Sequence, residues 1–365
     1  MGEKTIEKNA ITEGVIWKQL LIFFFPIMLG TLIQQLYTTV DTIIVGRFVG
    51  KAALASVGGP AAVLSTIVVT FFNGLANGAA VIIAQYYGAK DRKSLHVGLH
   101  TAYLFSIVIS LIVSLVGTVL TPWLLTIMNT PQDMMADSTI YLRIYFMGIL
   151  FTLVYNMGAA IMRAVGDSRR PLLYLLVCCV MNIILDIVMV VGMKMGIAGA
   201  ALATVISQCV SAILVTWSLT RAYDAMKLKF RELRMDARVL KKELKIGVPG
   251  ALQACAYGVT NVVIQASVNS FGTDTAAGWA AYGKLDLIFW TVSSALGAAV
   301  TTFAGQNYGA GKMDRGYKSI RVNVVISYIF TGAIIVILFV FCEPLYHMFT
   351  TDPKVIEIGV YMLRF

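Results

Sequence analysis

Nine apolar stretches, each longer than about 20 residues, follow one another along the chain, and about 20 apolar residues are what an α-helix needs to cross a bilayer. Only 13% of the residues are charged, whereas 58% are hydrophobic, so the chain lacks the polar surface of a soluble globular protein. We therefore predict an all-α integral membrane protein. The predicted spans are residues 17–44, 52–86, 95–121, 138–162, 171–193, 197–220, 244–270, 277–308 and 319–342, with a tenth opening near residue 355.

Lysine and arginine gather in alternate connections between these spans. With a cytoplasmic N-terminus, the cytoplasmic segments hold 22 of the 29 basic residues and the outer segments hold four. This asymmetry is the usual signature of membrane orientation. We therefore expect a multi-pass protein of the plasma membrane with its N-terminus in the cytoplasm. The net charge of +10 is explained by this distribution and does not indicate nucleic-acid binding.

The two halves of the chain resemble each other at an offset of about 222 residues, as parallel repeats in transporters do. The stretch Gln85-Tyr86-Tyr87-Gly88-Ala89 recurs as Gln306-Asn307-Tyr308-Gly309-Ala310, and Pro26 recurs as Pro249. A duplicated six-span unit predicts two six-helix bundles with the same orientation.

The predicted domains are an N-terminal bundle at residues 1–220, a cytoplasmic linker at residues 221–243 and a C-terminal bundle at residues 244–365. The basic linker is either an amphipathic helix at the lipid headgroups or a plain solvated connector. The second bundle ends within its fourth helix, so about ten of twelve helices are present. We expect this to reflect a C-terminal truncation.

Two acidic residues lie inside apolar spans. Asp41 is near the end of the first span, and Asp186 follows Asn182 by one helical turn in the fifth. A charged residue at the centre of a span costs about 2.5–3.5 kcal/mol in insertion experiments, so such a residue needs a function or a partner. The helical rise places both acids in the outer half of the membrane, at the depth of Thr204 in the sixth span.

We expect these side chains to converge with Tyr37 inside the first bundle. Two carboxylates in a low-dielectric cavity cannot both ionise at low cost, so the group is predicted to bind a coupling ion, either H⁺ or Na⁺. The predicted cation site consists of Asp41, Asn182, Asp186 and Thr204. The alternative is that the two acids only accept hydrogen bonds between packed helices. The matching seventh span has no carboxylate and offers an uncharged stripe that includes Gln253 and Tyr257.

The chain resembles the multidrug and toxic compound extrusion (MATE) transporters along its whole length. The matching motifs are Pro26 and Asp41, the Gln85–Asp91 turn, the Arg163–Pro171 turn, Asn182 and Asp186, Gly196–Ala200 with Thr204, and Gly305–Ala310. The resemblance implies a twelve-helix, two-lobe antiporter that expels amphipathic, often cationic compounds against H⁺ or Na⁺. It also implies the cation site named above and places Tyr37 and Asn156 near the substrate. Our predicted substrate-binding residues are Tyr37, Asn156, Gln34, Gln253 and Tyr257.

Other classes of function fit the sequence less well. A flippase for a lipid-linked saccharide would favour a strongly cationic cavity, whereas few basic residues lie inside the spans. A membrane-embedded enzyme is disfavoured because the sequence has no H-E-x-x-H or G-x-S-x-G motif. A non-transporting membrane protein remains the third alternative. We expect a monomer in contact with lipid, with a small organic substrate and no cofactor besides the coupling ion.

Overall fold

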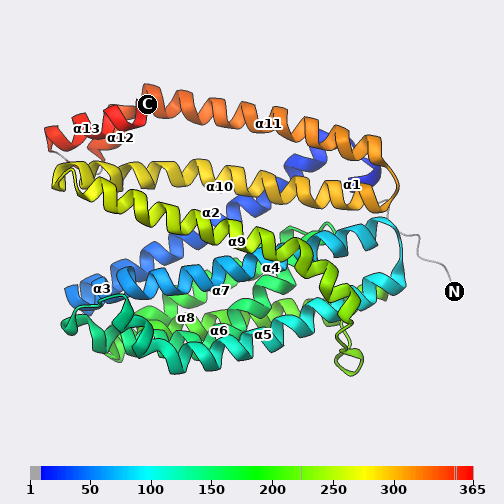
Figure 1. Cartoon of the computed structure of the whole chain (residues 1–365), viewed down its shortest axis with the longest axis horizontal. Helices are drawn as coiled ribbons and strands as arrows, with labels where there is room; N and C mark the ends of the chain where they lie inside the picture. Colours follow the sequence, from blue (N-terminus) through cyan, green and yellow to red (C-terminus); the bar gives the residue numbers. More distant parts are fainter. Residues whose placement is uncertain (1–9, 223, 349, 351, 365) are drawn as a thin grey trace.

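The computed structural model describes residues 10–222, 224–348, 350 and 352–364, and these residues form helices without any strand (Figure 1). The long helices are α2 (Ile16–Phe48), α4 (Ala62–Gly88), α5 (Arg92–Ile127), α6 (Gln132–Ala164), α7 (Arg169–Asp186), α8 (Gly196–Thr220), α9 (Ala237–Asn269), α10 (Thr273–Gly309) and α11 (Met313–Val340). The short helices are α1 (Ala10–Glu13), α3 (Lys51–Ser56), α12 (Cys342–His347) and α13 (Pro353–Arg364). Among these described residues, eight helical segments are long and apolar enough to cross a membrane. The prediction of an all-helical membrane protein is confirmed.

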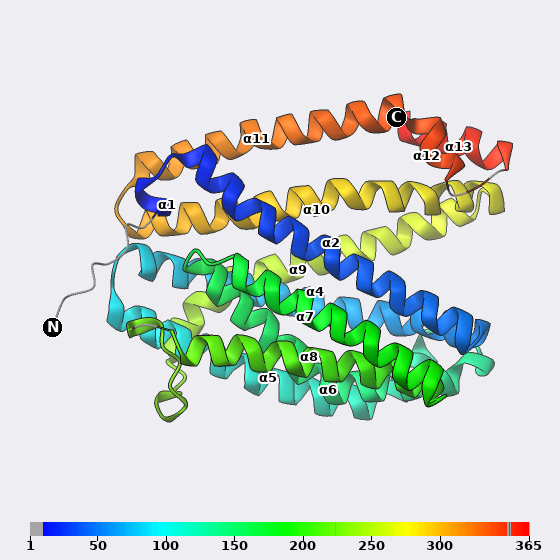
Figure 2. The ribbon, with the colours of Figure 1, turned by 180° about the vertical axis from the view of Figure 1, so that it is seen from behind.

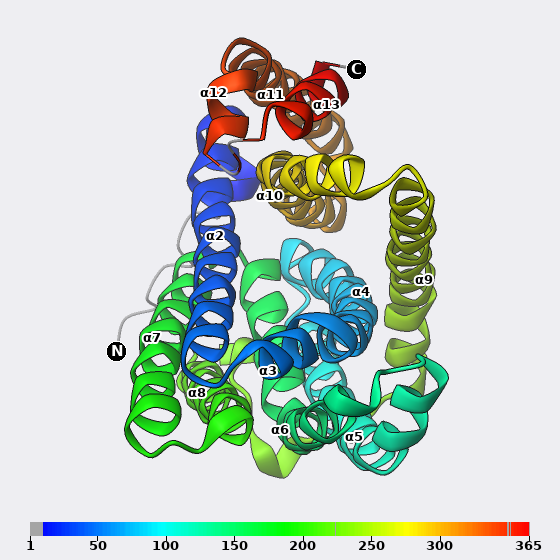
Figure 3. The same ribbon diagram turned by 90° about the vertical axis from the view of Figure 1, so that its left-hand side faces the viewer.

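The helices form two lobes. The first lobe contains α3 to α8, and the second contains α10 to α13. Helices α2 and α9 lie on opposite sides of the molecule, with α4 and α10 between them (Figure 3). We call the face at which α2 begins the proximal face, and the face at which it ends the distal face.

Helix α2 belongs to both lobes (Figure 2). Near the proximal face, its Phe23 and Phe24 pack against α10 and α11 in the hydrophobic core of the second lobe. Near the distal face, its Ile44 and Val45 are part of the core of the first lobe. Pro26 lies where α2 passes from one lobe to the other. A proline inside a helix removes one backbone hydrogen bond, so α2 is weakest at this crossing.

Helix α9 begins seven residues earlier than the predicted span and packs mainly against α4 of the first lobe. The residues of closest contact are Gly74 and Gly78 on α4, against Ala251 and Gly247 on α9. A β-carbon on either α4 glycine would overlap the α9 backbone. Small residues allow this close approach of two helices.

The predicted linker is shorter than expected and does not contain an amphipathic helix. Residues 237–243 belong to α9, and the preceding residues form only the short turns Asp224–Met226 and Phe230–Glu232. Of the two alternatives, the described residues match the plain connector. Two of its backbone N–H groups, those of Lys229 and Asp236, donate to the side chains of His100 and Thr101 on α5.

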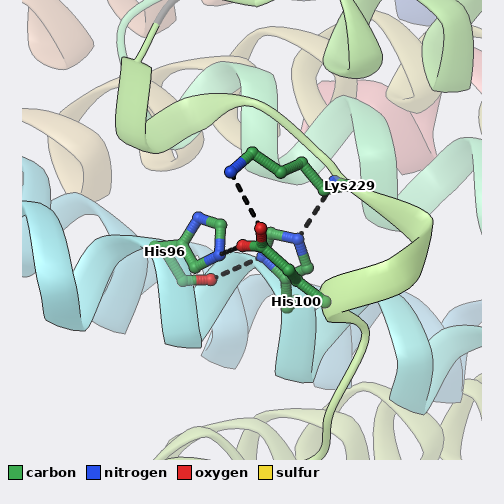
Figure 4. Close-up of polar contacts among 4 residues, drawn as sticks. His96, His100 and Lys229 are labelled. Carbon is green, nitrogen blue, oxygen red and sulfur yellow. Dashed lines mark hydrogen bonds and ion pairs between the residues drawn. The ribbon is translucent and has the colours of Figure 1, made fainter.

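Two histidines of α5 hold this linker in place (Figure 4). The backbone N–H of Lys229 donates to His100 Nε2 over 3.1 Å, and His100 Nδ1 donates to the carbonyl of His96 over 2.8 Å. Glu232 joins the two segments, because its carboxylate lies 2.8 Å from His96 Nε2 and 2.9 Å from Lys229 Nζ. Both imidazoles are therefore used to anchor the connection between the lobes.

Acidification is expected to loosen the linker. The hydrogen bond from Lys229 and the neighbouring His96 hold the pKa of Glu232 below its usual range. A carboxyl group whose pKa is lowered in the docked state favours docking above its undocked pKa, and this contribution is lost as the pH falls through the docked value. Glu232→Gln should remove the pH dependence. Hydrogen exchange of the Lys229 amide measures the effect, and Glu343→Gln provides a control at the distal end of the chain. Equal exchange in wild type and Glu232→Gln at every pH would contradict the assignment.

Candidate functional site

The two acids predicted to share an ion lie together inside the first lobe. Asp41 is on the distal half of α2, and Asp186 is the last residue of α7, which packs against α2. Asp41 is 6% exposed and Asp186 is 0% exposed. Their carboxyl groups interact directly with each other. The structure therefore places the two acids beside each other on one side of their bundle.

Asn182 and Thr204 complete the group. Asn182 lies one turn before Asp186 on α7, and its Nδ2 is 3.5 Å from Thr204 Oγ1 on α8. The Thr204 hydroxyl in turn donates to the carbonyl of Ala200 over 3.1 Å. All four residues of the predicted cation site are therefore brought together from three helices.

Several oxygens of this group lack a donor among the described residues. They are Asp41 Oδ1, Asn182 Oδ1, Asp186 Oδ1 and Asp186 Oδ2. Buried polar atoms without a partner are costly, and two carboxylates cannot satisfy each other because neither carries a hydrogen. One proton between them would create a donor, and Na⁺ is a cation that carboxylate and amide oxygens of this kind would bind. This group of oxygens is therefore suited to either coupling ion.

A break in helical regularity follows Asp186. The helix continues as a π-helical turn over Ile187–Gly192, and such turns are frequent at functional sites because they widen the helix. The irregular turn therefore lies directly beyond Asp186.

Aromatic residues surround the acid pair. Tyr37 is half-buried on α2 and lies within electrostatic range of Asp41 and of Tyr145 on α6. Tyr141 is 8% exposed and lies within range of both acids, and its ring stacks against that of Tyr145 at 6.3 Å between centroids. Tyr141 and Tyr145 were not among the site residues predicted from the sequence. Their spacing of four residues was the available signal, but it could not be interpreted without knowing which face of α6 points at α2.

A second feature is a central cavity of about 490 Å³ between the lobes. Pro26 and Gln34 of α2 line it, together with Asn156 of α6. Further lining residues come from α4, α7 and α10: Asn73, Asn77, Leu172, Leu175, Ser294, Thr301 and Thr302. Gln34 and Asn156 are therefore placed in one polar cavity, as predicted for substrate-binding residues.

Three predicted substrate-binding residues lie elsewhere. Tyr37 is near the acid pair and is not part of the cavity lining. Gln253 and Tyr257 are exposed on α9, and the Tyr257 ring packs against Trp290 of α10 at 5.0 Å. Neither Gln253 nor Tyr257 lines the central cavity in this conformation.

The sequence analysis also missed a carboxylate on α9. Glu243 was assigned to the linker, so the seventh helix was expected to carry no acid. It lies in the second turn of α9, is 2% exposed, and has no donor to either carboxyl oxygen among the described residues. Its backbone carbonyl lies against Gly78 of α4. Because the residues around Glu243 are polar, the sequence did not indicate that α9 begins before it.

The lobes meet tightly at the proximal face through the repeated motif. Gly88 at the end of α4 lies against the backbone of Gln306, and Gly309 at the end of α10 lies against the backbone of Gln85. The Gln306 side chain also donates from Nε2 to the carbonyl of Ala164 over 2.7 Å. We call the contacts of Gln85, Gly88, Ala164, Gln306 and Gly309 the proximal gate. The repeat detected in the sequence is thus a reciprocal contact about the axis that relates the two lobes.

Two helical lobes, a pair of buried acids inside one of them and a polar cavity between them are typical of a membrane transporter. The MatE family model matches residues 26–188 and 249–365. The chain belongs to this family.

Relatives and solved structures agree with this assignment. The chain is 32% identical over 360 residues to the probable multidrug resistance protein YpnP of Bacillus subtilis (strain 168), covering 97% of this chain and 79% of YpnP. It is 29% identical over 353 residues to the probable multidrug resistance protein YoeA of the same organism, covering 94% and 76%. A solved structure described as the outward-facing conformation of a multidrug resistance MATE family transporter has the same fold, with a TM-score of 0.89, 21% identity and coverage of 99% and 81%.

Proposed function

We propose that this protein is a secondary active exporter that moves small organic compounds out of the cell in exchange for H⁺ or Na⁺. The observation that carries the proposal is the buried pair Asp41 and Asp186, whose oxygens lack donors among the described residues. Such a pair is destabilised when empty and stabilised when it holds a positive ion. The ion gradient can therefore favour one conformation of the first lobe over another.

Helix α2 provides the physical connection between the ion and the gate. Its distal half carries Asp41, and its proximal half packs on α10, which carries Gln306 and Gly309 of the proximal gate. A change in how Asp41 packs against α7 therefore changes the direction of a helix that also contacts the gate helix. Pro26 lies between these two halves and lines the cavity, so bending there alters the cavity as well.

The proposed orientation puts the proximal face in the cytoplasm. The basic residues are concentrated in the segments that connect helices at this face, as expected for cytoplasmic loops. With the lobes joined at the proximal gate, the conformation described here is outward-facing. Loss of ion-dependent packing at Asp41 would then precede opening at the cytoplasmic side.

The coupling ion is tested by transport in proteoliposomes under separately imposed proton and sodium gradients. The expected result is substrate accumulation driven by one of the two gradients, with none when both are absent. Transport that is independent of both gradients would contradict the proposed antiport. The measurement needs no prior choice between the ions, because each gradient is imposed alone.

A further inference from the structure

The central cavity carries an unusual set of charges for an exporter of organic cations. Among the described residues that line it, Arg163 is the one charged side chain, and there is no carboxylate. Asp41 and Asp186 lie outside the lining, and so does the buried Glu243 of α9. Asp286 of α10 also lies outside it and accepts a hydrogen bond from Trp290 Nε1 at 2.9 Å. A cation entering the cavity would therefore meet a positive charge without a compensating acid.

Arg163 has no described anionic partner. It is half-buried in the last turn of α6, and the neighbouring group that acts on it electrostatically is the phenol of Tyr155. The nearest acid in the sequence, Asp167, is occupied: it lies 3.3 Å from Arg170 Nε and accepts from the amides of Arg169 and Arg170. A guanidinium withdrawn from water without a counter-ion is unfavourable. Its five donors are available for a ligand.

The rest of the lining suits a polar compound that carries one acidic group. Side-chain amides of Gln34, Asn73, Asn77 and Asn156 can donate to and accept from such a ligand. Leu172 and Leu175 supply an apolar wall. A guanidinium binds a carboxylate, sulfonate or phosphate through two parallel hydrogen bonds, which fixes the orientation of the ligand.

We propose that the central cavity takes organic anions, with the acidic group of the ligand paired to Arg163 and its body against the amides of α2, α4 and α6. This inference rests on the proposed function, in which the cavity lies on the export route. It departs from the cationic substrates expected from the resemblance, because the charge in the cavity has the opposite sign. The position of Arg163 also places the bound anion beside Ala164, whose carbonyl accepts from Gln306 in the proximal gate.

Two dyes with the same xanthene skeleton test the sign of the ligand charge. Fluorescein is anionic at neutral pH and rhodamine 6G is cationic, and their binding to the purified full chain is followed by fluorescence anisotropy with protein-free micelles as the blank. We expect fluorescein to bind more tightly than rhodamine 6G. Arg163→Gln should weaken fluorescein binding by about tenfold or more, which corresponds to about 1.4 kcal/mol. Arg163→Glu should reverse the preference.

Two further variants separate ligand binding from folding. Arg143→Gln removes the same charge from an exposed position of the same helix, and it should leave both affinities unchanged. Arg163→Lys keeps the charge but loses the paired hydrogen bonds, so it should retain part of the fluorescein affinity and remain well above Arg163→Gln. Equal losses in Arg143→Gln and Arg163→Gln would overturn the proposal.

The binding assay needs no ion gradient, so it can fail independently of the proposed antiport. Tighter binding of rhodamine 6G that is insensitive to Arg163→Glu would overturn the ligand class while leaving ion-driven export intact. Fluorescein binding that depends on Arg163, together with transport that ignores both ion gradients, would support the ligand class and contradict the antiport.

Discussion

Asp186→Asn and Asp41→Asn should each abolish ion-driven transport while leaving the protein folded. An amide in place of either carboxylate supplies the missing donor, so the pair is satisfied without an ion and the first lobe stays in one state. Coupling free energies between sites are typically about 1–3 kcal/mol, which predicts a decrease in gradient-driven transport of about 5- to 150-fold. Proteoliposomes loaded with a fluorescent substrate measure this loss.

The control for this prediction is Asp133→Asn, an identical substitution at an exposed position of the first turn of α6. It should leave transport unchanged. The thermal stability of the Asp41 and Asp186 variants should not decrease, because the amide removes repulsion between two buried carboxylates. Full gradient-driven transport in both acid variants at equal protein levels would remove these residues from the coupling site.

Gly88→Ala and Gly309→Ala should prevent the proximal gate from closing. A β-carbon at either position would overlap a backbone carbonyl of the opposite lobe, at Gln306 or Gln85. A backbone cannot move aside as a side chain can, so the lobes must separate. Overpacking of a dense contact costs typically about 1–3 kcal/mol, enough to shift a two-state population by about 5- to 150-fold.

Spin labels at Lys93 and Met313, both exposed at the proximal starts of α5 and α11, measure this separation. The distance between the labels should increase in both glycine variants, and transport should decrease with it. Gly283→Ala lies on α10 with no atom near its added methyl group, so it should keep the wild-type distance. An unchanged distance distribution in the Gly88 and Gly309 variants would show that these contacts do not hold the gate.

The ion site was predictable from the sequence because its signals are local. A carboxylate inside an apolar span is conspicuous, Asn182 and Asp186 are one turn apart, and the helical rise alone matches their depth to that of Thr204. The predicted convergence of these residues required only that the helices be adjacent. The structure places them together, while their role in ion binding stays a prediction.

The features that could not be predicted depend on how each helix is rotated and where it begins. Gln253 and Tyr257 have the right chemistry for a substrate site, but both are exposed on α9 and neither lines the central cavity. Glu243 lies in a run of charged residues that is typical of a linker. In the structure, α9 already begins at Ala237, so Glu243 is part of that helix. The positive charge of the cavity could not be predicted for the same reason. Arg163 was assigned to the turn after the fourth span, whereas in the structure it is part of α6.

The shared position of α2 has a consequence for the assembly of the protein. Phe23 and Phe24 pack against Phe303 and Phe330, which lie far along the chain, at 6.2 Å and 5.3 Å between ring centroids. These partners are synthesised about 300 residues later, so the contact has a very high sequence separation. The contact between α2 and the second lobe can therefore form only after α10 and α11 have been synthesised.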